Sequence, residues 1–322
     1  MKTKSSLMIL SLVAAACVTA AVCGAQDKAK TAPKPPPPDK TKVPEISAAD
    51  LEKIEAALPA KAAKPKKTRK LLVFWRCDGF FHGSGVAGGN KCIELMGKKT
   101  GAWTCDFSRE WEALSAENLA KYDGLVFNNT TSLDHTPEIR QALLDFINNG
   151  KAIIGIHGAT DNFGKWPEGQ QLMGGRFAGH PWGGGGPGGK TDGKWAFKLD
   201  EPNHPLCRAF GGKSFRLKDE IYQFKDAYTR ADRRVLIGMD LTDEETAKPI
   251  RSLDPKTNKP RGCRTDDDYA VSWIKNVGKG RLFYCSLGHA MNVFQDAPVV
   301  QYYLDGIQWA LGDIKADATP KK

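Results

Sequence analysis

Short apolar runs alternate with amphipathic stretches from residue 70 to residue 156. The apolar runs are predicted strands, at 71–75, 102–107, 124–127 and 152–156. The stretches between them are predicted helices, at 90–99, 116–122 and 137–148. Alternating strands and helices predict an α/β fold, a flavodoxin-like doubly wound, mostly parallel sheet with helices on both faces.

The pattern is less regular after residue 166, but apolar segments continue towards the carboxyl end. Helices are predicted at 168–177 and 299–311. Further strands are predicted at 194–199, 221–224, 235–239, 270–273 and 281–285. We therefore expect one α/β domain over residues 70–314, followed by a disordered tail at 315–322.

The first 25 residues have the pattern of a cleaved signal peptide. Lys2 and Lys4 precede an uncharged, largely apolar run at 7–22, and small residues up to Ala25 offer a cleavage site. The run is shorter than the ~20 residues that a membrane-spanning helix needs, so we expect no transmembrane span. A lipid anchor at Cys17 is disfavoured, because no bulky aliphatic residue stands three places before it. The protein is therefore predicted to be exported, to the periplasm or outside the cell.

The segment from residue 26 to residue 69 is rich in lysine, proline and alanine, which predicts an extended linker. Within it, Ser47 and Asp50 fit the start of a short helix near 47–58. The net charge of +10 comes mostly from this part of the chain, because residues 26–70 hold twelve Lys or Arg and six Asp or Glu. Such a charged segment is usually solvated and disordered, and weak tethering to an anionic surface is the alternative. The nearly neutral domain disfavours nucleic acid as a partner.

Cysteine spacing excludes two kinds of site. Eight cysteines are present, two of them in the predicted signal peptide. No two have the C-x-x-C spacing, so the sequence supports neither a zinc ribbon nor a thioredoxin-type redox motif. Export permits disulfides, but their pairing does not follow from the sequence.

Three histidines follow predicted strands: His82 after the first, His157 directly after the fourth and His289 after the last. The carboxyl ends of parallel strands meet at one edge of a sheet, where α/β proteins bind ligands. His157 precedes Gly158 in a tight strand-to-helix turn, the position of the nucleophile in an elbow motif. A single loop histidine is usually a partly exposed polar residue. Three in equivalent positions predict a shared pocket.

Other polar and aromatic residues near the strand ends are weaker candidates. The third predicted strand ends in Asn128, Asn129 and Thr130, and His180 lies in a Gly-His-Pro turn. Trp166 can stack on a sugar ring, although tryptophan more commonly fills a core.

Several motifs, in order along residues 70–312, resemble the ThuA-like (trehalose utilisation) family. They lie at 79–82, 126–131, 155–161, 166–167, 179–181, 219–222, 272–273, 278–281 and 286–289. The resemblance implies a fold similar to class I glutamine amidotransferases, which place a cysteine at the elbow and a histidine after a late strand. Here His157 stands at the elbow and His289 at the late-strand position. Because an imidazole cannot form the thioester of glutamine hydrolysis, we do not expect a glutaminase.

The family's link to trehalose use implies a carbohydrate substrate, and keto-sugars or keto-glycosides suit a pocket of imidazoles and a carboxylate. We expect proton abstraction beside the keto group, giving isomerisation or elimination. The expected catalytic residues are His157, His289, His82 and Glu220. The expected substrate contacts are Asn128, Asn129, Thr130, Asp161, Trp166, His180 and Tyr222. The three catalytic histidines can also hold a divalent metal, typically zinc.

Two alternatives remain open at this stage. The imidazoles can form a metal-free acid–base set instead of a metal site. The pocket can also bind carbohydrate without catalysing a reaction, because the elbow lacks a nucleophilic cysteine. A hydrolase with paired carboxylates is a weaker third candidate, since no pair of acids is marked by its position.

Overall fold

The computed structural model describes residues 38–184 and 193–321. Residues from Pro38 onwards form one compact unit. The predicted signal peptide, Cys17 and the first part of the predicted linker lie outside the described residues. Within the described ranges, no helix combines the length and the apolar character needed to cross a membrane.

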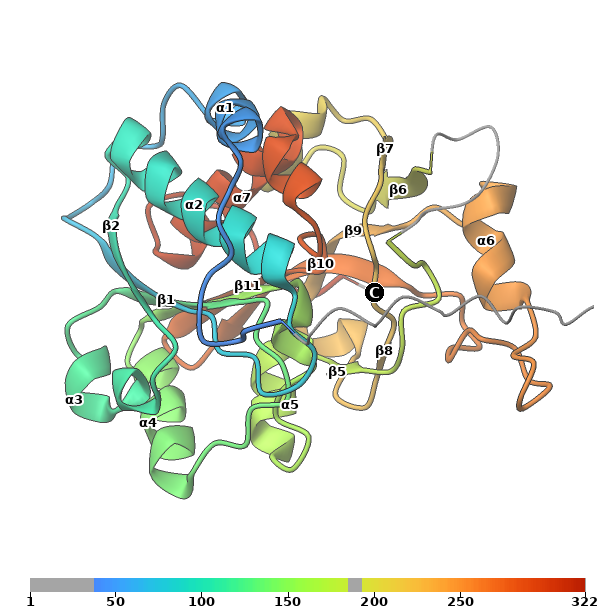
Figure 1. The fold of residues 1–322 in the computed structure, drawn as a ribbon, viewed down its shortest axis with the longest axis horizontal. Coiled ribbons are helices and arrows are strands. Elements are labelled where there is room, and N and C mark those ends of the chain that lie inside the picture. Colours follow the sequence, from blue (N-terminus) through green and yellow to red (C-terminus); the bar gives the residue numbers. More distant parts are fainter. Residues whose placement is uncertain (1–37, 185–192, 322) are drawn as a thin grey trace, which may run out of the picture. The chain divides into compact units, whose positions relative to one another are not determined.

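A nine-stranded sheet forms the centre of the fold, in the order β2-β1-β3-β4-β11-β10-β9-β6-β7 (Figure 1). Its strands are β1 Lys70–Phe74, β2 Thr104–Ser108, β3 Gly124–Asn128, β4 Ala152–Ile156, β6 Trp195–Leu199, β7 Phe215–Leu217, β9 Arg234–Met239, β10 Ala270–Val277 and β11 Gly280–Cys285. The strands from β2 to β11 in this order pair in parallel, and the remaining neighbours are antiparallel. The predicted α/β class is confirmed, with an antiparallel extension on one side.

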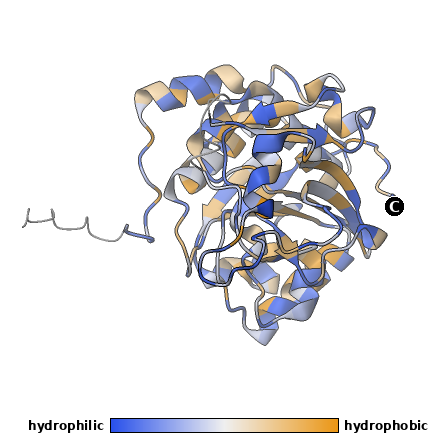
Figure 2. Cartoon of the chain, turned by 90° about the vertical axis from the view of Figure 1, so that its right-hand side faces the viewer, coloured by the Kyte–Doolittle hydropathy of each residue, from blue (hydrophilic) through white to orange (hydrophobic). Residues whose placement is uncertain are grey.

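Helices cover both faces of the parallel part of the sheet. The helices are α1 Ala48–Ala57, α2 Gly83–Thr100, α3 Ala116–Leu119, α4 Pro137–Asn148, α5 Pro167–Met173, α6 Glu244–Arg251 and α7 Ala297–Ala310. Alternate residues of β1 face opposite layers: Leu71 packs in the core under α1, α2 and α7, whereas Leu72 packs in the core with α3, α4 and α5. The outer helices carry hydrophilic as well as hydrophobic residues, as expected of elements with one face in water (Figure 2).

Several predicted elements match the structure closely, and the differences have local causes. The predicted helix at 168–177 ends early, because Gly174 adopts a left-handed conformation after α5. The short strand β5, Arg176–Phe177, follows and pairs with β8, Phe224–Lys225. The predicted strand at 221–224 is therefore mostly loop. The sequence pattern did not predict α6, which is strongly polar and contains Pro249.

The expected linker and tail are both packed against the domain where they are described. Gln308 exchanges two hydrogen bonds with the backbone of Ala63. The Arg69 guanidinium, at the end of the predicted linker, binds the fully buried Asp313 carboxylate. At the other terminus, the indole of Trp309 donates to the carbonyl of Ala316. The prediction of an unpacked linker up to residue 69 and a disordered tail is therefore wrong for these residues, because buried polar partners hold them in place.

Candidate functional site

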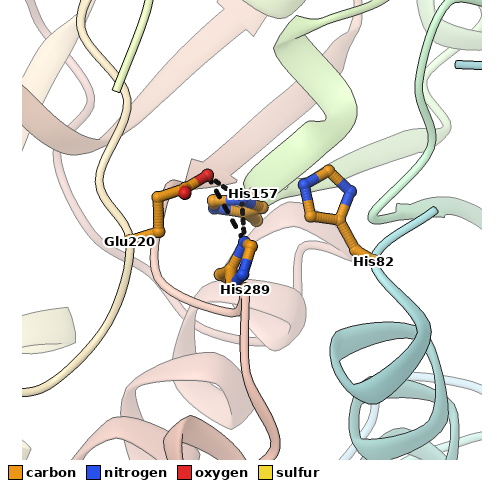
Figure 3. A group of neighbouring side chains, drawn as sticks. All are labelled: His82, His157, Glu220 and His289. Atoms are coloured by element: carbon orange, nitrogen blue, oxygen red, sulfur yellow. Dashed lines mark hydrogen bonds and ion pairs between the residues drawn. The ribbon is translucent and has the colours of Figure 1, made fainter. Parts of the chain in front are cut away.

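Four side chains from distant parts of the chain meet at the carboxyl ends of the parallel strands (Figure 3). His82 directly precedes α2, His157 follows β4, Glu220 lies between β7 and β8, and His289 follows β11. Each offers one nitrogen or oxygen atom that could coordinate a metal ion, and these atoms all lie within 4.8 Å of one another. The strand order explains the meeting, because β11 lies beside β4 with Cys285 opposite Ile156. The residues that follow the two strands are therefore neighbours.

A strained turn presents His157 to this cluster. The residue has a φ of +44°, which is unusual for any residue other than glycine, and it opens a short 3-10 helix, His157–Thr160. Gly158 packs closely on the loop after β3, since a methyl group there would lie 3.0 Å from the carbonyl oxygen of Asn129. The Tyr284 hydroxyl donates to the His157 carbonyl at 2.8 Å. The surrounding contacts hold the turn in this conformation.

The hydrogen bonds of His157 indicate which ring nitrogen carries the proton. Its Nδ1 lies 2.8 Å from the carbonyl oxygen of Ser286, which can only accept, so Nδ1 is the donor. Burial, reinforced by the neighbouring imidazoles of His82 and His289, holds the pKa of His157 well below its usual value, so the ring is neutral. In a neutral ring with a proton on Nδ1, the lone pair of Nε2 points into the cluster.

Glu220 and His289 form the charged part of the site. His289 Nδ1 lies 3.4 Å from Glu220 Oε1 and 3.3 Å from His157 Nε2. Burial opposes charge on both groups, but their mutual attraction outweighs it. The pKa of Glu220 is lowered and the pKa of His289 is raised. Without a bound ligand the pair is therefore a carboxylate beside an imidazole that readily carries a proton.

His82 and Tyr222 close one side of the cluster. Both side chains are almost fully buried, and the Tyr222 hydroxyl lies 3.1 Å from His82 Nε2. Burial, with a contribution from His289, lowers the pKa of His82 to about 4, so this ring is also neutral. The Tyr222 ring lies 4.3 Å from the His157 ring, between centroids.

Two residues at the rim are open to solvent. His180 is about half exposed, and its Nδ1 lies 3.3 Å from Glu220 Oε2. Phe80 is 66% exposed; its ring lies edge-on to His82, with the centroids 4.9 Å apart, and nearly parallel to His289, with the centroids 6.4 Å apart. Its loop is fixed to the end of β3, since the Thr131 hydroxyl donates to the Phe80 carbonyl at 2.7 Å. Sequence reasoning did not select Phe80, because exposure cannot be read from residue type.

Asp219 is a positioning residue that sequence reasoning also missed. Its carboxylate accepts hydrogen bonds from the backbone N–H of Gly288 at 2.7 Å and of His289 at 3.4 Å. Burial raises the pKa of Asp219 to about 7, against the effect of these bonds. Asp219 lies in the motif at 219–222, but that motif did not assign it a role in the site.

The family of the chain follows from comparison with known proteins. The family model ThuA, described as trehalose utilisation, matches residues 70–310, which contain all four cluster residues. The chain belongs to the ThuA family. No curated protein matches it.

Solved structures agree with this assignment at the level of the fold. A ThuA-like protein from Bacteroides uniformis is 18% identical, with a TM-score of 0.59 over 77% of this chain and 94% of its own. A ThuA-like protein from Parabacteroides merdae is 18% identical, with a TM-score of 0.52 over 76% of this chain and 90% of its own. The sequence-based recognition is therefore confirmed, and the ThuA chain belongs to a carbohydrate-related family.

The remaining candidate residues of this ThuA domain lie outside the cluster. Asn128, Asn129 and Thr130 are fully buried and form hydrogen bonds to Asn90 in α2 and to Gly288 and Asn162 in neighbouring loops. Trp166 is 4% exposed and packs against Phe163 and His135 in the core. It is not free to stack on a sugar and instead fills the core, as tryptophan more commonly does. Asp161 faces a separate cavity.

The donor set of the ThuA cluster fits a divalent cation. Two ligands at ~2.1 Å from a tetrahedral zinc lie about 3.4 Å apart. His289 Nδ1 lies 3.3 Å from His157 Nε2 and 3.4 Å from Glu220 Oε1, and the last two atoms are 3.8 Å apart. The Nδ1–H donation of His157 to a carbonyl is the outer contact that orients metal-ligating histidines. Two imidazoles and a carboxylate also suit manganese or iron, so spacing alone does not select the metal.

Proposed function

We propose that this ThuA-family protein is an enzyme that moves a proton beside the carbonyl of a keto-sugar or keto-glycoside, at a divalent-cation site. His157, His289 and Glu220 would hold the cation, with His82 beside them. One observation supports this most directly. Four ligand-type atoms from four separate segments lie within 4.8 Å of one another at the carboxyl edge of the sheet.

The proposed reaction needs no oxidant or second substrate. Removal of the C–H proton beside the keto group leaves an enolate. Where that carbon carries a hydroxyl group, transfer of the hydroxyl proton to the former keto oxygen and return of a proton to the former carbonyl carbon give isomerisation. Loss of a glycosidic oxygen β to the carbonyl gives an enone, while the leaving alkoxide takes up a proton and departs as an alcohol. A bound cation would polarise the keto oxygen and stabilise the negative charge that develops on it.

The residues around the ligands suit the transfer of a proton. His180 is half exposed and lies beside Glu220 without belonging to the close group of ligands. An imidazole can act as a general base, and His180 would take the substrate proton. Phe80 offers an exposed apolar ring beside His82 and His289. The C–H face of a sugar ring can pack on it.

Replacement of His157 tests both the metal and the reaction. The purified full chain should contain about one divalent ion per molecule by elemental analysis. It should also convert a 3-keto-glycoside, as followed by NMR. His157→Ala should lose the metal and lower turnover ~100-fold or more. His204→Asn is the matched control: His204 caps a distant 3-10 helix, and asparagine preserves the cap.

Three other outcomes separate the alternatives. Turnover by metal-free protein that still depends on His157 would support a metal-free acid–base set. Tight sugar binding without turnover of any keto-glycoside would support a non-catalytic binding module. Turnover that is unchanged in His157→Ala would contradict a reaction at this cluster.

We also propose that the protein is exported. The support is the sequence pattern of residues 1–25, which lie outside the described structure. Expression of the full chain should yield mature protein in the periplasm or the medium that begins after Ala25, as determined by amino-terminal sequencing. Recovery of the intact chain from the cytoplasm alone would contradict export.

A further inference from the structure

The segment from residue 61 to residue 70 holds six basic residues and no acidic residue. A block of like charges this dense is typical of a disordered tail, but here the backbone is fixed to the domain. Gln308 binds both the N–H and the carbonyl of Ala63, and the Asp313 carboxylate accepts from the N–H of Lys66. The lysine side chains of this segment are therefore attached to an ordered scaffold.

The segment lies at the amino-terminal ends of the parallel strands. The Arg69 carbonyl accepts from the N–H of Thr104, which begins β2, and the Lys70 carbonyl accepts from the N–H of Asp123, which precedes β3. The histidine cluster lies at the carboxyl ends of the same set of strands. A strand of five residues, such as β1, is roughly 17 Å long, so the segment and the cluster occupy opposite edges of the sheet.

The last turn of α2 extends this basic region. Its Lys98 lines a cavity of about 450 Å³ together with Lys64 and Lys67. The neighbouring Lys99 donates to the carbonyl of Leu58, just before the segment. The basic surface is defined by the exposed lysines at 61, 64, 66, 67, 98 and 99.

The charge of the basic surface is largely uncompensated. Lys67 pairs with Asp123 at 2.5 Å. Over residues 38–184 and 193–321, four of the other ammonium groups form neither an ion pair nor a hydrogen bond, those of Lys61, Lys64, Lys66 and Lys98. Such groups on a fixed backbone attract an anionic partner, because little of their field is cancelled within the fold.

The side chains of the region favour a layer of lipid headgroups over nucleic acid. The guanidinium of Arg69 is buried against Asp313, and the Trp103 ring in the wall of the cavity is buried with its indole donating to the carbonyl of Ile93. Neither is available for bidentate contact with a base or for stacking on one. The exposed lysines are point charges on flexible stems, which suit the phosphates of a fluid layer.

We propose that the basic surface holds the protein on an anionic phospholipid membrane, with the histidine cluster on the edge of the sheet that faces away from the lipid. Further lysines at 28, 30, 34, 40 and 42 continue the positive charge towards the amino terminus. The attraction is electrostatic and does not depend on the reaction at the cluster.

Co-sedimentation of the purified protein with vesicles tests the proposal. Wild type should bind phosphatidylglycerol vesicles at low salt, and ~0.5 M NaCl should release it. The triple variant Lys64→Gln, Lys66→Gln, Lys98→Gln should bind ~30-fold more weakly or less, since each lysine near an anionic surface strengthens binding about fivefold. Vesicles of phosphatidylcholine alone measure any binding through the apolar run at 7–22, which is the same in every variant.

The matched control removes the same charge from another part of the surface. Lys248→Gln, Lys256→Gln, Lys259→Gln alters exposed lysines of α6 and the loop after it, far from α2 in Figure 1, and should bind like wild type. Equal loss in both triple variants would show an effect of net charge alone and overturn the proposal. Unchanged binding in the first variant would also overturn it, as would a preference for duplex DNA over the anionic vesicles.

Amide hydrogen exchange tests the orientation on the membrane. Bound vesicles should slow exchange at 61–70 and 98–104 and leave it unchanged at 155–161, beside the histidine cluster. Slower exchange at 155–161 with none at 61–70 would place the lipid at the opposite edge of the sheet and contradict the proposal.

Discussion

The behaviour of a single histidine in this protein depends on what its two ring nitrogens contact. His157 is fully buried, yet its environment is polar: a carbonyl fixes Nδ1–H, and Nε2 faces a carboxylate and an imidazole. His135 is also buried but lies among the rings of Trp111, Phe163 and Trp166. The polar surroundings of His157 suit a side chain that coordinates a metal, whereas the aromatic surroundings of His135 suit a side chain packed in the core.

His135 should make the folded state sensitive to acid. Burial, with a contribution from Arg140, lowers its pKa from 6.5 to about 4. Above pH 6.5 the ring is neutral in both the folded and the unfolded state. As the pH falls from 6.5 to 4 the unfolded state binds the proton first, so the free energy of unfolding decreases, by about 3 kcal/mol in all.

His135→Phe should remove this dependence, because phenylalanine keeps the ring without the titrating group. Urea unfolding of the two proteins at pH 7 and pH 5 measures the effect. All other titrating groups are shared, so the difference between the two pH profiles isolates residue 135. Parallel loss of stability in both proteins between these pH values would contradict the prediction.

At the scale of elements, α7 approaches the sheet closely because of a glycine. A methyl group at Gly306 would overlap the ring of Phe283 on β11. Ala normally favours a helix over Gly by about 1 kcal/mol. Here overpacking should dominate, so Gly306→Ala should lower the free energy of unfolding by ~1–3 kcal/mol.

Gly164→Ala is the control for Gly306→Ala, since a methyl group at Gly164 would meet nothing within 4 Å. Denaturant unfolding of the two variants measures the difference. A Gly306→Ala protein as stable as wild type would show that α7 can move away from β11 at no cost. Because β11 ends at the cluster, metal content of this variant also reports whether the helix position affects the site.

At the scale of the whole molecule, the segment before β1 is joined to the end of the chain by a buried ion pair. The Asp313 side chain is fully buried and binds both the Arg69 guanidinium and the backbone N–H of Lys66. Asp313→Ala would leave the Arg69 charge buried without its main partner. We expect a loss of ~3–5 kcal/mol in the free energy of unfolding.

Lys42→Ala provides the comparison, because Lys42 forms an exposed pair with Asp39 and should contribute nothing measurable. Thermal and urea unfolding of both variants measure the contrast. Similar stability of the two variants would show that residues 59–69 are dispensable for the domain. A large loss in Asp313→Ala alone would show that they belong to it.

Local patterns in the sequence determined the strands and helices from β1 to β4. Their apolar periodicity reflects which side of each element is buried, and this holds for any arrangement of the neighbours. The same patterns placed His157 at a strand end, and the ordered motifs identified the family. The short helix α6 was missed because most of its residues are polar and it contains Pro249.

Only the tertiary structure decided which segments are neighbours. The order of strands puts β11 beside β4 and so joins His289 to His157, 132 residues away in the chain. It also buries Trp166, leaves Phe80 exposed and binds the supposed linker to the domain. Contacts between distant segments depend on how whole surfaces fit together, and this fit leaves no periodic trace in the sequence.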